Sequence, residues 1–257
     1  MVEVSFEVLL LLILASAFAG LVDSIAGGGG LIQLPSLLVA LPGTQPAVIL
    51  GTNKLPASLG TATATITYLR RLRPNFRIAS LMAVPAFIGS ALGARVATQI
   101  PREVFQPIIL IALILVFTYT FFRKELGLTE AKLERKGSQG IKAAFFGSAI
   151  GFYDGIFGPG TGSFLMLALI AVLGYAFLEA TVTTKIVNLS TNIGALLVFG
   201  FSGKILWSLG LCMAIGNIAG GLLGARLAIR GGSGLIRKIF LLATSLLIIR
   251  LAADTFL

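Results

Sequence analysis

Long apolar stretches separated by short polar connections run along almost the entire chain. They lie at about 8–22, 46–69, 78–98, 104–122, 141–153, 180–201, 205–229 and 236–253. Most of them approach the roughly 17–25 residues that a helix needs to cross the hydrocarbon core of a bilayer. The pattern predicts an all-α polytopic membrane protein with about eight conventional transmembrane segments.

Two further apolar segments, 31–41 and 162–173, are too short to span, and each follows a glycine-rich run. About 11 residues at 1.5 Å each reach only about half of a 30 Å core. We therefore expect each segment to be half of a broken, re-entrant helical hairpin with the glycine cluster at its tip.

The chain also repeats itself at a constant offset. Residues 20–97 return 131 positions later without a gap, so that Asp23 and Lys54 reappear as Asp154 and Lys185. We read this as two homologous repeats, 1–122 and 141–257, joined by a cytoplasmic linker at 123–140. Internal duplication is common in secondary transporters, whose substrate site lies where the two copies meet near the bilayer midplane.

Composition supports a membrane location. Hydrophobic residues make up 56% of the chain and charged residues only 12%, compared with roughly 25% charged residues in soluble domains. Mean hydropathy is +0.98. The first apolar stretch resembles a signal peptide, but Glu3 and Glu7 precede it and its counterpart in the second repeat is internal, so we expect it to be a span.

The formal net charge of +10 would suggest nucleic acid as the partner of a soluble protein. Here the basic residues cluster at span ends, at 70–77, 123–142 and 230–238, which indicates cytoplasmic loops of a multi-pass protein of the inner (plasma) membrane. We expect the lipid bilayer as partner and no nucleic acid. The three clusters share one side if the repeats are inverted; parallel repeats are the alternative if each hairpin is a single kinked span.

The hairpin tips carry the candidate chemistry. Irregular backbone at membrane depth must line a cavity or be buried in protein, and glycine lets the backbone approach a ligand closely. Each helix that restarts there exposes unpaired amides, an arrangement that binds anions. The candidate substrate-binding residues at the tips are Asp23, Gly27, Gly28, Gly29 and Gly30 in the first copy, and Asp154, Gly158, Gly160, Thr161 and Gly162 in the second.

Two duplicated lysines, Lys54 and Lys185, lie early in long apolar segments. An intramembrane ammonium needs a carboxylate, a carbonyl or an anionic substrate as partner. In one interpretation each aspartate pairs with a lysine and locks the hairpin to the following helix; in the other, the amines and the tip amides share an anion. Nearby amide side chains, Asn53, Asn188 and Asn192, complete the predicted site.

The residues that zinc binding, histidine-based catalysis and disulfide formation require are absent from the sequence. The chain contains no histidine and one cysteine, Cys212, which removes the usual zinc ligand, the imidazole general base and any intrachain disulfide. We expect no cofactor and no metal.

Taken together, three motifs closely resemble the TauE/SafE family of sulfite-exporter-like permeases. They are the glycine-rich run 20–30 with Pro35, the element Thr52-Asn53-Lys54, and the run 151–164. The resemblance covers nearly the whole chain. It implies a bacterial or archaeal plasma-membrane protein that moves sulfite, sulfonates or other small organic and sulfur-containing anions outward.

We therefore expect a secondary exporter of small anions and not an enzyme. A membrane-embedded enzyme acting on an anionic lipid would also explain a basic polar pocket, although it lacks an evident catalytic base. A passive anion channel is a third reading, which saturable, uphill transport would exclude. The sequence leaves a homo-oligomer open.

Cysteine labelling tests the predicted topology. In a Cys212→Ser background, single cysteines within 70–77, 123–142 and 230–238 should react only from the cytoplasmic side, because the positive-inside rule places these loops there. Strong external labelling of Gly234→Cys would overturn the inverted arrangement.

Overall fold

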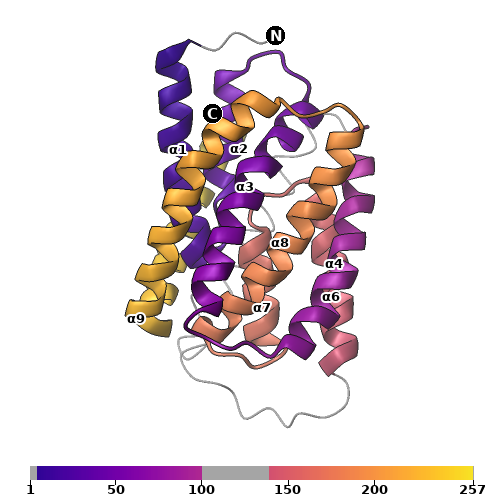
Figure 1. The fold of residues 1–257 in the computed structure, drawn as a ribbon, viewed down its shortest axis with the longest axis vertical. Helices are drawn as coiled ribbons and strands as arrows, with labels where there is room; N and C mark the ends of the chain where they lie inside the picture. The colour runs from indigo at the N-terminus through magenta and orange to yellow at the C-terminus, as the bar shows by residue number, and fades with distance from the viewer. Residues whose placement is uncertain (1–4, 100–138, 257) are drawn as a thin grey trace.

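The computed structural model describes residues 5–99 and 139–256, and its regular structure is entirely α-helical (Figure 1). The helices are α1 (Phe6–Ala26), α2 (Gly30–Ala40), α3 (Pro46–Leu69), α4 (Phe76–Ala97), α6 (Gln139–Ile156), α7 (Thr161–Ala171), α8 (Phe177–Phe201) and α9 (Trp207–Phe256). The all-α prediction is confirmed. The apolar stretch 104–122 and nearly all of the linker lie outside the described residues.

Four of the described helices are long and apolar enough to cross a bilayer: α1, α4, α8 and the part of α9 up to Gly232. At Gly232 the backbone turns through φ 61° and ψ −167°, which divides α9 into two helical pieces. The division falls between the apolar stretches 205–229 and 236–253. Helices α2 and α7, with 11 residues each, are the two short segments expected from the sequence.

Helix boundaries follow the 131-residue offset. Helices α2, α3 and α4 begin at Gly30, Pro46 and Phe76, and α7, α8 and α9 begin 131 residues later in each case. A turn precedes each short helix because glycine there adopts a left-handed backbone: Gly27 has φ 79° and its counterpart Gly158 has φ 83°. The same local sequence thus breaks the helix at the same place in both halves.

Contacts between helices give their directions. Helices α4 and α6 run parallel, since Gly147 and Gly151 pack against Met82 and Ala86 in the same order. Helices α1 and α9 also run parallel, because Ile13, Ala17 and Leu21 meet Gly216, Gly220 and Gly224 in turn. Helices α3 and α8 run antiparallel: Lys204 Nζ, just after α8, donates to Gln45 Oε1, just before α3, at 2.9 Å.

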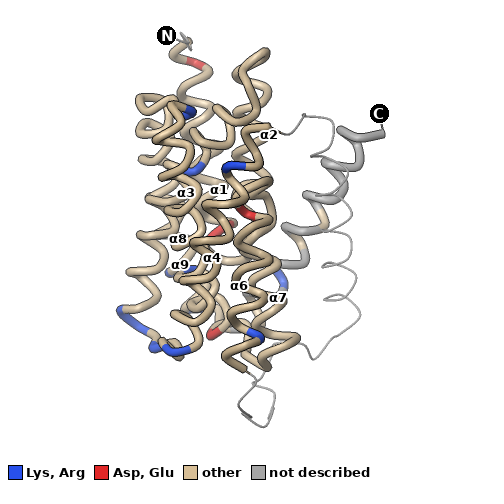
Figure 2. Tube along the Cα trace, turned by 90° about the vertical axis from the view of Figure 1, so that its right-hand side faces the viewer, with Lys and Arg blue, Asp and Glu red and all other residues tan. Residues whose placement is uncertain are grey.

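Helix α3 is parallel to α9, and α4 is parallel to α8, as the contacts of Gly210, Gly60 and Gly194 indicate. Corresponding helices of the two halves therefore point in opposite directions, as inverted copies would. The described basic residues at 70–77, 142 and 226–230 consequently fall at one end of the bundle. Figure 2 shows Lys and Arg mainly at the ends, with a small group of acidic and basic positions at mid-height. The orientation in a membrane stays a prediction.

Closely spaced glycines hold the parallel pairs together. The sequence predicts small-residue helix packing at Gly89 and Gly93 and at Gly216, Gly220 and Gly224. The structure confirms it: a Cβ on Gly93 would lie 2.1 Å from Phe152 O, and one on Gly220 would lie 1.8 Å from Ala17 O.

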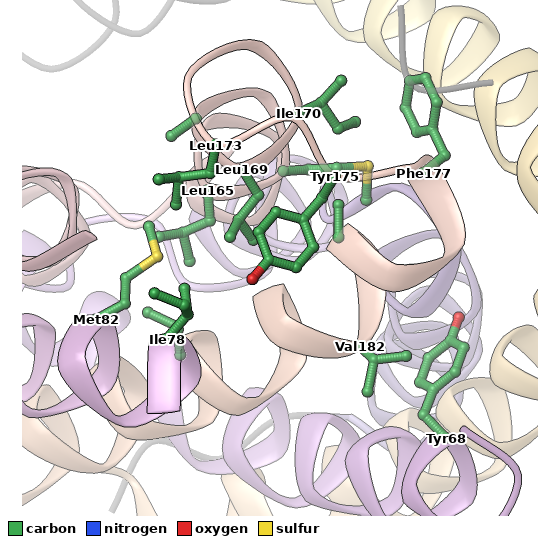
Figure 3. Close-up of a cluster of buried hydrophobic side chains, with 14 of the residues drawn as sticks. Tyr68, Ile78, Met82, Leu165, Leu169, Ile170, Leu173, Tyr175, Phe177 and Val182 are labelled. Carbon is green, nitrogen blue, oxygen red and sulfur yellow. The ribbon is translucent and has the colours of Figure 1, made fainter. Parts of the chain in front are cut away.

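Two apolar clusters close the bundle above and below its middle. One surrounds α7 and contains Tyr68, Met82, Leu165, Leu169 and Phe177 (Figure 3). The other surrounds α2 and includes Leu34, Leu37, Ile49, Leu50 and Phe199. Each short helix is therefore packed in apolar side chains at its own end of the bundle, and the polar residues at the hairpin tips lie between the clusters.

Substitution of Gly220 by alanine should destabilise the detergent-solubilised protein by about 1–3 kcal/mol, because the added methyl group overpacks the α1–α9 contact. Gly234→Ala is the matched control: it also lies within α9, but a Cβ there meets nothing within 4 Å. Thermal unfolding compares the two variants. An equal effect would show that close packing at Gly220 is unimportant for stability.

Candidate functional site

The two hairpin tips meet inside the bundle. A Cβ on Gly27 would lie 2.4 Å from the carbonyl carbon of Gly162, so any side chain there would force the tips apart. Ser163 Oγ also donates to Ala26 O across the junction at 3.1 Å. The glycines are therefore required for the backbones of the two halves to touch.

One buried ion pair lies beside this junction. Lys54 Nζ on α3 is 2.6 Å from Asp154 Oδ2 on α6, and it also donates to Asn192 Oδ1 on α8 at 3.2 Å. Thr161 Oγ1, at the start of α7, donates to the other carboxylate oxygen of Asp154 at 2.7 Å. Both charged residues are only 2% exposed. The carboxylate is thus held by an ammonium and a hydroxyl group.

The second ion pair joins the other lysine and aspartate. Lys185 Nζ on α8 lies 2.8 Å from Asp23 Oδ2 on α1 and donates to the Asp23 backbone carbonyl. Thr61 Oγ1 makes a longer bond of 3.4 Å to the same carboxylate. The Lys185 side chain is fully buried, whereas that of Asp23 is 17% exposed. This pair is therefore held less tightly on the side of its carboxylate.

Both pairs cross between the two halves of the chain. Each aspartate pairs with a lysine, as one of the two interpretations expected, but the pair does not lock the hairpin to the helix that follows it: Lys54 binds Asp154, and Lys185 binds Asp23. The physical reason is the contact between the tips, which carries each aspartate to the long helix of the opposite half. Each ion pair therefore joins a hairpin to the other repeat.

A small polar cavity of about 30 Å³ lies at this crossing. That volume is room for one or two water molecules. Twelve of the predicted site residues line it: Asp23, Gly27, Gly29, Gly30, Asn53, Lys54, Asp154, Gly158, Thr161, Gly162, Asn188 and Asn192. Gly28, Gly160 and Lys185 are not among the lining residues, and Lys185 lies behind Asp23 as its ion-pair partner.

Four residues that line the cavity were not predicted from the sequence: Gln33, Ala57, Thr61 and Asn217. A signal existed for two of them. Gln33 stands in a short apolar segment and Asn217 in a long one, and polar side chains at membrane depth are expensive unless they have partners or a function.

The cavity wall also holds a polar atom without a partner. Asn53 Oδ1 is buried and accepts no hydrogen bond within the described residues. Leaving such an atom unsatisfied costs about 1–3 kcal/mol. A bound water or ligand donor in the cavity would recover that cost.

The electrostatics of the site are balanced: two lysines face two aspartates. Helices α2 and α7 begin at the cavity, at Gly30 and Thr161, and helix N-termini favour anions; the Thr161 N–H already donates to Gly158 O at 3.4 Å. An anion can therefore enter only by competing with the carboxylates for the ammonium groups. Within residues 5–99 and 139–256, no three His, Cys, Asp or Glu side chains gather as metal ligands would.

Comparison with known proteins places this chain in a wider group. The family model described as "Sulfite exporter TauE/SafE" matches residues 12–251. A probable membrane transporter protein of a Sinorhizobium species, ORF9, is 38% identical over 99% of this chain and 96% of its own length. The Escherichia coli K12 protein YfcA, also named a probable membrane transporter, is 35% identical over 95% and 89%. A probable membrane transporter protein of Haemophilus influenzae is 33% identical over 98% and 97%. No solved structure matches the chain.

The crossed pairing gives a stability prediction. Lys54→Met leaves Asp154 as an unpaired buried charge and should destabilise the protein by about 3–5 kcal/mol. Adding Asp154→Asn to that variant should restore most of the loss, because the orphaned charge is removed. Adding Asp23→Asn instead is the matched control and should not restore stability. Thermal unfolding of the four proteins in detergent measures the effect. Rescue by Asp23→Asn in place of Asp154→Asn would contradict the crossed pairing.

Proposed function

The chain belongs to the sulfite exporter TauE/SafE family, and from that premise we propose that it is a secondary transporter that exports small sulfur-containing or organic anions, such as sulfite or sulfonates. The family and the named relatives establish a membrane transporter. The anion, the outward direction and the location in the inner (plasma) membrane, as a multi-pass protein, are parts of the proposal.

The crossed lysine–aspartate pairs carry the proposal. An ammonium paired with a carboxylate costs less to keep inside the bundle than an unpaired one, yet it becomes available when an anion replaces the carboxylate. The site can therefore bind an anionic substrate without carrying a permanent net positive charge inside the membrane. The N-terminal ends of α2 and α7 beside the cavity supply further donors to the same anion.

The same pairs suggest how binding is coupled to movement. Each pair ties the hairpin of one half to the long helix of the other, so exchange of a carboxylate for the substrate loosens one tie between the halves. Inverted-repeat transporters work by movement of one repeat or bundle against the other around a central site. Binding of the transported anion therefore also weakens the contact that holds the two halves together, which allows them to move.

The described conformation leaves little room at the site. A cavity of about 30 Å³ does not hold an oxyanion together with its hydration, and apolar clusters lie at both ends of the bundle. Loading then requires one end to open while the other remains sealed, as alternating access demands.

The anion class is tested by measuring the unfolding of the purified protein with one anion added at a time. The anions are sulfite, sulfate, thiosulfate and small sulfonates. A true ligand at 100 times its dissociation constant should raise the unfolding free energy by about 2.7 kcal/mol. Lys54→Met/Asp154→Asn, which removes the lysine without leaving an orphan charge, should weaken anion binding by more than the tenfold that about 1.4 kcal/mol represents.

Folding of that double variant is checked by its unfolding transition without ligand. Unchanged anion affinity in a folded Lys54→Met/Asp154→Asn protein, and in the matching Lys185→Met/Asp23→Asn protein, would make the lysines purely structural. In liposomes, transport should saturate with substrate and run uphill against a gradient when driven, which a passive channel does not do.

A further inference from the structure

A second polar cluster reaches the cavity from one side. Ser16 on α1, Gln33 on α2 and Asn217 on α9 are joined by hydrogen bonds: Asn217 Nδ2 donates to Gln33 Oε1 at 3.0 Å, and both amides donate to Ser16 Oγ at 3.2 Å. Ser16, Gln33 and Asn217 are 0%, 1% and 4% exposed. Gln33 and Asn217 line the cavity beside Asp23 and Lys54, whereas Ser16 does not.

The hydrogen-bond inventory leaves one donor and one acceptor on the cavity wall. An amide group offers two N–H donors and one oxygen acceptor. Gln33 Nε2 uses one hydrogen on Ser16, so its second is available, while both hydrogens of Asn217 Nδ2 are used. Among the described residues, nothing donates to Asn217 Oδ1. An available donor on Gln33 and an available acceptor on Asn217, two amides joined by a hydrogen bond, match a hydroxyl group, which also accepts and donates.

Asn217 is held firmly in place. A Cβ on Gly60 would lie 1.8 Å from Asn217 Oδ1, and one on Gly20 would lie 2.9 Å from the same oxygen. The amide therefore sits in a slot between α1 and α3 that only glycine leaves open. A side chain fixed in this way can orient a ligand without first losing its own freedom.

The opposite side of the cavity has no equivalent among the described residues. At the offset of 131 residues, Gln33 corresponds to Phe164, Asn217 to Ala86 and Ser16 to Gly147. Phe164 stacks edge to face on Tyr153, with ring centroids 5.0 Å apart. The charged centre of the site is thus duplicated, whereas the uncharged polar arm belongs to one side only.

Resting on the proposed function, we infer that Gln33 and Asn217 form a subsite for an uncharged hydrogen-bonding group of the substrate. The substrate class is then an organic anion that bears a hydroxyl or similar group close to its anionic head. The lysines and tip amides take the head, and the arm takes the hydroxyl. A bare inorganic anion would leave the arm unused.

An interhelical clamp alone would also need these hydrogen bonds, because polar side chains join helices in membranes. The two roles differ in what they affect. A clamp contributes to stability but does not distinguish between ligands, whereas a subsite distinguishes a hydroxylated ligand from the same molecule without its hydroxyl group. A site built to bond a hydroxyl group rejects the analogue that lacks it.

The experiment compares 2-hydroxyethanesulfonate with ethanesulfonate, by ligand titration of the thermal unfolding of the full-length protein in detergent. The wild-type protein should bind the hydroxylated anion about tenfold more tightly, the ratio that roughly 1.4 kcal/mol gives. Gln33→Leu should bring the two affinities nearly together by weakening only the hydroxylated ligand. If that variant does not fold, Gln33→Met asks the same question with an unbranched side chain.

Two control variants separate the roles. Phe164→Leu alters the corresponding position of the other half, and Ser24→Ala removes an α1–α9 hydrogen bond, from Ser24 Oγ to Gly221 O, that involves neither amide of the subsite; both should keep the preference. Loss of the preference in Ser24→Ala would overturn the subsite and leave a clamp. Equal wild-type affinities for the two sulfonates, with binding still dependent on Lys54, would overturn the subsite but not the proposed function. Failure of every anion to stabilise the protein would overturn both.

Discussion

The architecture depends on the need to pair two ammonium groups that lie inside an apolar bundle. An unpaired buried charge is so unfavourable that each lysine must meet a carboxylate, and here each carboxylate comes from the other half of the chain. That meeting requires the hairpin tips to touch, which is possible only because Gly27 and Gly162 have no side chains. Charge pairing therefore depends on the contact between the tips, and that contact depends on the glycine-rich helix breaks. The polar cavity is the small space that remains where they coincide.

Local features of the site followed from the sequence. The glycine-rich runs 27–30 and 158–162 have low helix propensity, so the tips and the short helices α2 and α7 could be predicted to within about one or two residues, the usual uncertainty of helix ends. Lysine and aspartate inside apolar stretches are costly enough to mark a site without any knowledge of the fold. Even the close packing at Gly93 and Gly220 followed from their spacing by four residues along a helix.

The pairing of charges could not be predicted in the same way. A repeat keeps Asp23 and Lys54 at the same separation as Asp154 and Lys185, so pairing within a copy and pairing between copies look identical in the sequence. Only the contact between the tips decides between them. Gln33 and Asn217 were missed for a related reason: they are 184 residues apart, and each alone looks like an isolated polar residue in an apolar helix. Their common position on the cavity wall is a property of the packing.

The glycine-packed interfaces leave neither half of the chain complete by itself. Helix α4 packs on α6 and α1 packs on α9, so each of these contacts joins helices from different halves. A single half-length protein would have left those glycine faces without a partner and both its lysine and its aspartate unpaired. Such a half-length chain would need a second molecule inserted in the opposite direction. A single chain that contains both halves fixes, by its covalent connection, the relative orientation that two half-length chains would have to find by dual insertion.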